Sequence, residues 1–153
     1  DTGHAADAER LLDEAAAALQ DAGQWFMLLV EFLRATLAVG RGEADRAIAL
    51  ARTSLTRIRL LRDQFAFLYA LVPLAGAAAL KGHDAWAARI MGARAAVADL
   101  TDVGIVDQYL RDRLADIERD GRDRLGIDRW TRAYAAGRTT SIEALAQDID
   151  PKS

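Results

Sequence analysis

An internal repeat of about forty residues constrains the fold of this chain more than any other feature. The motif Gly-x-x-x-x-Ala occurs three times, with starts 39 and 40 residues apart, at Gly3, Gly42 and Gly82. After each copy, apolar residues continue at the spacing of an amphipathic helix. The glycine permits a tight turn, and the alanine lets the next helix pack closely against the previous one. The pattern predicts helical hairpins that stack, because a single hairpin cannot bury its apolar face.

The helices between these copies repeat as well. Matching residues lie forty positions apart: Gln24-Trp25 and Gln64-Phe65, Leu28 and Leu68, Ala35 and Ala75. Glycines and charged pairs separate the segments, as expected at turns. We therefore predict eight helices, over residues 5–22, 24–40, 44–62, 64–81, 84–100, 105–124, 128–136 and 141–149.

Composition favours helices throughout the chain. Alanine contributes 33 of the 153 residues, and it combines the best helix propensity with a small side chain. Residues typical of strands are scarce, and no run alternates with period two. A chain of this length suits one domain with its own core. We predict a single all-α domain over residues 1–153.

The repeated motif and three segments near the end of the chain carry a family resemblance. Gly-x-x-x-x-Ala at the start of each second helix resembles the tetratricopeptide repeat, although forty residues exceed that family's period of about 34. The three segments are similar to the closing part of the helical arrays in bacterial STAND-type regulators, including MalT-like and LuxR-type proteins. They are AARIMGA (87–93), RWTRAYAAGR (129–138) and SIEA (141–144).

The resemblance implies an α-α superhelix of tetratricopeptide-like hairpins with an irregular helical C-terminal cap. Its units are a half-repeat at 1–22, repeats at 24–62 and 64–103, and a cap at 105–149. It also implies the regulatory array of a larger bacterial signalling ATPase or transcription regulator, and it carries over no catalytic residue. Because the first helix matches the second member of a hairpin, we expect its partner before Asp1. That helix then either exposes one flank or contacts another molecule, such as a second copy.

Residue types that support catalysis or metal binding are sparse. His4 and His83 are the only histidines, both beside turn glycines, and cysteine is absent, so a zinc site would lack ligands. Asp99, Asp102 and Asp107 flank a turn, where capping and solvation explain them better than paired catalytic carboxylates do. No serine lies in a nucleophile elbow, and no glycine-rich phosphate loop is present. We predict a non-enzyme without metal or cofactor.

Charge and hydropathy limit the class of partner. The net charge of -3 argues against direct nucleic-acid binding, which normally requires a basic domain. Six arginines between residues 41 and 62 could contact an acidic partner, although a solvated outer face explains them more simply. No apolar run reaches the length of a membrane span and no signal peptide opens the chain. We therefore expect a cytoplasmic protein without a membrane partner.

The candidate binding surface is the face of the first helix in each hairpin, which lines the concave side of tetratricopeptide-like arrays. In the first full repeat this face carries charges, which are costly to bury unpaired; forty residues later it is apolar in the middle. An amphipathic helix or peptide could dock on such a groove. Alternatively, the final helices around Trp130 and Tyr134 cover it. The residues that define the predicted groove are Gln24, Glu31, Arg34, Gln64, Leu71 and Leu74.

The sequence thus favours a non-catalytic scaffold for protein–protein interaction or effector sensing. Two alternatives remain open. A helical sensor of a small molecule would need a closed pocket with convergent polar groups. A structural dimerisation module would pair through the first helix.

Overall fold

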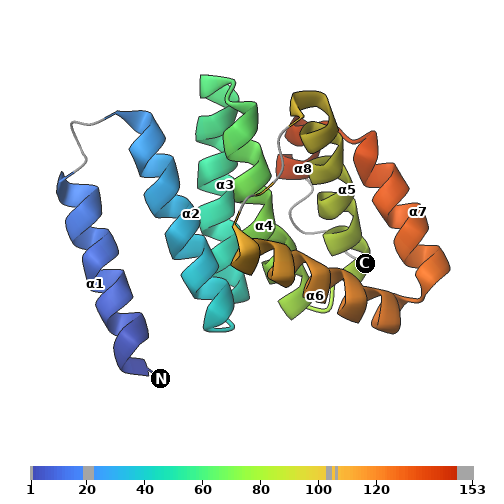
Figure 1. Cartoon of the computed structure of the whole chain (residues 1–153), viewed down its shortest axis with the longest axis horizontal. Helices are drawn as coiled ribbons and strands as arrows, with labels where there is room; N and C mark the ends of the chain where they lie inside the picture. The colour runs from blue at the N-terminus through green and yellow to red at the C-terminus, as the bar shows by residue number, and fades with distance from the viewer. Residues whose placement is uncertain (1, 19–22, 103–104, 106, 148–153) are drawn as a thin grey trace.

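The computed structural model describes residues 2–18, 23–102, 105 and 107–147 (Figure 1). Its regular structure in these ranges consists of helices alone, which confirms the all-α prediction. Most helices begin and end within three residues of the predicted bounds. They are α1 (Thr2–Ala18), α2 (Gln24–Gly40), α3 (Ala44–Leu61), α4 (Gln64–Leu80), α5 (Asp84–Thr101), α6 (Gln108–Leu125), α7 (Ile127–Arg138) and α8 (Ile142–Gln147). None of the described helices is long and apolar enough to cross a membrane.

The turns inside the α2–α3 and α4–α5 hairpins have the same geometry. Gly42 and Gly82 adopt φ angles of +76° and +72°, which glycine tolerates without strain. The residue after each glycine donates its N–H back into the preceding helix, from Glu43 to the Ala38 carbonyl and from His83 to the Ala78 carbonyl, both at 2.9 Å. This is the Schellman arrangement, which satisfies carbonyl groups left free at a helix end.

The ends of the two hairpins also correspond. Arg62 directly follows α3 and Asp102 directly follows α5, both in the left-handed conformation, with φ angles of 54° and 51°. The next residue after Arg62, Asp63, caps α4 by accepting a hydrogen bond from the Ala66 N–H at 3.1 Å. Residues 24–62 and 64–102 are therefore two copies of one hairpin, related by forty positions in helix bounds and turn geometry.

α4 is the central element of the core. Apart from Tyr69, it carries no polar side chain between Phe65 and Leu80, and a helix that is apolar on every side must be enclosed. It packs against α2, α3, α5 and α6, and Figure 1 shows α6 crossing in front of it. Pro73 lies inside α4, where its ring leaves the Tyr69 carbonyl without a helical donor.

The last three helices depart from the repeat. α6 contacts α4, α5 and α7, and α8 contacts α3. α7 lies along α5 (Figure 1), and glycines on both helices allow the approach. A Cβ on Gly92 would lie 2.0 Å from the Tyr134 carbonyl oxygen, and a Cβ on Gly137 would lie 2.0 Å from the Arg89 carbonyl oxygen. The segments 87–93 and 129–138 thus pack on each other.

Ion pairs connect α6 and α7 to α5. Arg124, in the last turn of α6, holds Asp84, in the first turn of α5, through two hydrogen bonds of 2.8 and 3.0 Å. Such a paired arrangement is directional, and each charge lies at the helix end whose dipole favours it. Arg138 of α7 donates to Asp99 of α5 at 2.7 Å.

The α5–α7 contact predicts a large effect of one methyl group. Gly137→Ala is expected to lower the free energy of unfolding by about 3 kcal/mol, since the helices must separate to admit the Cβ. Gly40→Ala is the matched control, because a Cβ at this helical glycine meets nothing within 4 Å, and it should raise stability by up to about 1 kcal/mol. Urea denaturation measures both. Equal effects of the two substitutions would contradict the close approach.

Candidate binding cleft

The predicted groove requires a correction at its floor. Leu71 and Leu74 have no exposed surface, because α4 is enclosed on all sides. The helices that pack against α4 are α2, α3, α5 and α6, whereas α7, which carries Trp130 and Tyr134, packs mainly against α5 and α6. The two leucines belong to the core and cannot contact a docked partner.

Glu31 is buried as half of an ion pair between helices. Its carboxylate accepts a hydrogen bond from the Ser54 hydroxyl at 3.2 Å and lies 3.0 Å from Arg57 Nε. Only 8% of the Glu31 side chain is exposed. At Glu31 this face of α2 therefore contacts polar partners from α3, and the carboxylate is not free to contact a docked peptide.

The other predicted residues are not brought together around Leu71 and Leu74. Arg34 pairs with Asp13 of α1, and Gln64 is exposed at the start of α4. The backbone of Gln24 begins α2, but its side chain lies outside the described part of the structure. Two further ion pairs hold Glu9 of α1, one from Arg41 in the turn after α2 at 3.1 Å and one from Arg46 of α3 at 2.7 Å.

The two hairpins differ at the positions of the buried ion pair. Glu31, Ser54 and Arg57 correspond to Leu71, Arg94 and Val97 forty residues later. In the second hairpin an apolar pair therefore replaces the charges. Arg94 instead donates from Nε to the Leu68 carbonyl at 3.3 Å, and burial lowers the pKa of its guanidinium.

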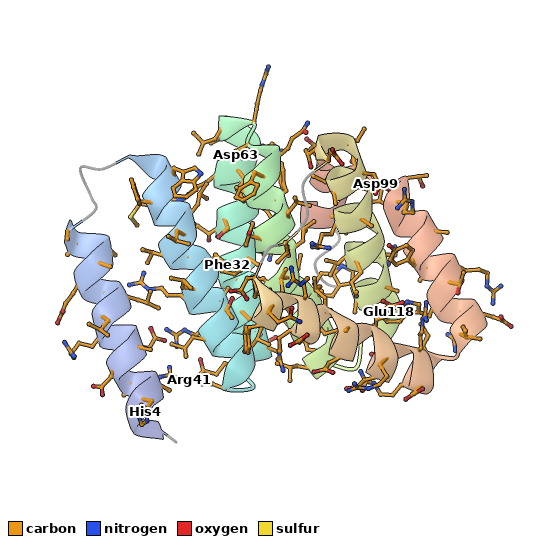
Figure 2. All side chains as sticks on the ribbon, viewed as in Figure 1. His4, Phe32, Arg41, Asp63, Asp99 and Glu118 are labelled. Atoms are coloured by element: carbon orange, nitrogen blue, oxygen red, sulfur yellow. The ribbon has the colours of Figure 1, made fainter. Side chains whose placement is uncertain are left out.

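An open cleft lies between the N-terminal halves of α2 and α4. Toward their other ends the two helices are in close contact, since a Cβ on Gly76 would lie 3.0 Å from a methyl group of Val39. Between the N-terminal halves a cavity of about 270 Å³ remains. It lies toward the end of the molecule marked by Asp63 in Figure 2, away from Arg41. We call it the α2–α4 cleft.

The walls of the α2–α4 cleft are almost entirely apolar. They comprise Trp25, Leu28, Leu29 and Phe32 of α2, Ser54 and Ile58 of α3, and Phe65, Ala66, Tyr69 and Ala70 of α4. The rings of Phe32 and Tyr69 meet edge to face across it, with centroids 5.8 Å apart. Trp25, Leu29 and Phe65 at the rim are 49%, 43% and 42% exposed. The cleft can therefore accept a large apolar group from solvent.

The residues that line the cleft carry three polar side-chain groups, which are two hydroxyls and the indole N–H of Trp25. The Ser54 hydroxyl is within hydrogen-bond distance of Glu31 and of the Leu50 carbonyl, so it has acceptors within the protein. Tyr69 contributes the second hydroxyl. Among the described residues, no group of three or more histidine or acidic side chains could hold a metal ion. The geometry supports binding through apolar contact.

Sequence reasoning used Trp25 and Phe65 only as markers of the repeat. An aromatic residue in the first turn of both first helices was the available signal, because one wall of the cleft comes from each.

Comparison of the chain with protein-family models, with curated proteins and with solved structures gives no match. The assignment of this site therefore rests on its geometry.

The buried ion pair predicts non-additive stabilities. Arg57→Val is expected to lower the free energy of unfolding by about 2 kcal/mol, because it leaves the Glu31 carboxylate buried without its cation. The double variant Glu31→Leu/Arg57→Val reproduces Leu71 and Val97 and should remain within about 1 kcal/mol of the wild type. Arg52→Val, on the exposed face of α3, serves as the control. A double variant that loses the sum of both single effects in urea denaturation would contradict the pairing.

Proposed function

We propose that this chain is a scaffold that binds an apolar segment of a partner polypeptide in the α2–α4 cleft. In this proposal the two hairpins are units of a short α-α superhelix of tetratricopeptide-like type. The forty-residue correspondence of helix bounds and turns supports it, as does the contact between α2 and α4, the first helices of the two hairpins. The regulatory role in a larger bacterial protein, implied by the resemblance, is part of the proposal.

The α2–α4 cleft is the observation that carries this function. Trp25, Leu29 and Phe65 surround it with more than two fifths of their area exposed, and Phe26 and Leu61 nearby are exposed to the same degree. Contiguous exposed apolar surface of this kind marks interaction sites on soluble proteins. Aromatic side chains around a pocket are typical anchors of such interfaces.

The chemistry of the walls favours a polypeptide over a small-molecule effector. A specific small-molecule site normally encloses its ligand and fixes it with several convergent polar groups. Here the rim is open, and only Ser54 and Tyr69 offer hydroxyl groups. An amphipathic helix needs neither feature, because its apolar ridge supplies the contact.

The charges beside the cleft indicate what should flank that ridge. Arg59 lies in the last turn of α3, Arg62 directly follows this helix, and both side chains are exposed. No carboxylate pairs with either of them in the part of the chain that the structure describes. Acidic residues beside the apolar anchors of a partner would complement these arginines and speed association.

Selection from a displayed library of helical peptides, each of about twenty residues, tests this function on the full chain. Enriched peptides should carry two large apolar side chains one helical turn apart, flanked by acidic residues. Leu29→Glu is expected to weaken their binding at least about tenfold, which is about 1.4 kcal/mol.

The matched control is Leu60→Glu, at a position 75% exposed on α3 and outside the cleft, which should leave binding unchanged. Circular dichroism checks that both variants remain helical. Selected peptides that bind Leu29→Glu as tightly as the wild type, or a selection without enrichment, would refute the proposed site.

A further inference from the structure

A second apolar groove lies on the other side of α2, between α2 and α1. Its volume is about 580 Å³, and we call it the α1–α2 groove. Leu11, Leu33 and Tyr109 within it are 55%, 41% and 58% exposed. The lining residues are Ala8, Leu11, Leu12 and Ala15 of α1, Leu33, Thr36, Leu37 and Gly40 of α2, and Tyr109 of α6.

The internal repeat shows what covers the same surface one unit later. The α1 positions Ala8, Leu12 and Ala15 correspond, 39 residues on, to Ala47, Ala51 and Ser54 of α3, which are all buried. α2 packs against α3, and the Ser54 hydroxyl donates to Glu31 of α2. In the α2–α3 hairpin, therefore, α2 covers the face of α3 that corresponds to the partly exposed face of α1.

The other wall of the groove gives the same result. The α2 positions Leu33, Thr36 and Leu37 correspond, forty residues on, to Pro73, Gly76 and Ala77 of α4, which are all buried. Val39 of α2 covers Gly76, because a Cβ placed on Gly76 would lie 3.8 Å from the Val39 Cβ. The α1–α2 groove thus continues, by one repeat, the interface through which α2 packs on α3 and α4.

We propose that the α1–α2 groove is the binding site for one further helix, an amphipathic helix from a partner polypeptide. The bound helix lies parallel to α2, just as α2 lies parallel to α4 (Figure 1). Its relation to α1 and α2 is the one that α2 has to α3 and α4. The groove lies outside the α2–α4 cleft and adds a second interaction surface to the proposed scaffold.

The lining of the groove specifies the chemistry of the occupant. Ser54 and Arg57, which hold the Glu31 carboxylate, correspond to Ala15 and Ala18 in α1. A carboxylate on the occupant at the Glu31 position would find no donor there, so this face must be apolar throughout. Thr36 stands where α4 has Gly76, so the occupant needs a small residue in place of Val39.

The free faces of α1 and α6 that a second copy would present do not match this groove. The positions of α1 outside the groove include Asp7, Arg10 and Glu14, so its free face is charged. The exposed face of α6 is also charged, with Arg119 held between Asp116 and Asp120. A separate amphipathic helix is therefore the occupant that fits.

Disulfide trapping tests the site and its direction, since the chain contains no cysteine. The probe is a synthetic peptide with the sequence of α2 (Gln24–Gly40) carrying Glu31→Ala and Val39→Cys, mixed with the full chain carrying Thr36→Cys. The Cβ separation of 3.8 Å at the corresponding Val39–Gly76 contact is the mean value for disulfides. In a buffer of reduced glutathione and glutathione disulfide, the latter being the oxidant, we expect cross-linking at least about tenfold faster than with the control variant Leu60→Cys.

Two further variants decide between binding sites and directions. Leu12→Glu, added to Thr36→Cys, should abolish the cross-link, with circular dichroism as the folding check. A peptide with Phe26→Cys in place of Val39→Cys should react no faster than the control, because it presents its thiol at the opposite end. Three results overturn the proposal: cross-linking that persists with Leu12→Glu, equal cross-linking of both peptides, or a rate no higher than that of Leu60→Cys. If the chain alone forms a dimer that Leu12→Glu disrupts, the groove binds a second copy, and this result also overturns the proposal.

Discussion

A helix that is apolar on every side needs neighbours on every side, and α4 imposes this requirement on the whole chain. Its side chains from Phe67 to Ala78 are buried except for Tyr69. One hairpin partner, α5, can cover only one of its faces. The preceding hairpin supplies α2 and α3, and α6 crosses the remaining face. Stacking of the hairpins and the departure of α6 from the repeat are thus two consequences of the same apolar surface.

Both proposed interaction surfaces arise because the repeat is imperfect. The small residues Ala35 and Ala75 recur at equivalent positions of α2 and α4, yet the large aromatic residues in the first turns leave the α2–α4 cleft between the helices. α1 occupies the place that α3 holds in the next unit, but it packs mainly on α2. The surface that a preceding first helix would cover remains open as the α1–α2 groove.

Sequence periodicity was sufficient for the elements and insufficient for their mutual orientation. Gly42 and Gly82 located the turns because their left-handed φ angles are a local property of the chain. The burial of Glu31 depended on which side of α2 faces Arg57, a relation between two helices. The closeness of α5 and α7 likewise depended on Gly92 and Gly137 meeting across a contact between segments about forty-five residues apart. Period and composition do not encode such crossings.

Hydrogen exchange of individual backbone amides tests most directly whether α4 is the enclosed centre of the fold. The account predicts that α4 amides exchange only through global unfolding and are among the slowest in the chain. Amides of α1, which packs mainly on one helix, should exchange at least about a hundredfold faster. Exchange in α4 as fast as in α1, or local opening of α4 while α2 and α5 stay protected, would contradict the account.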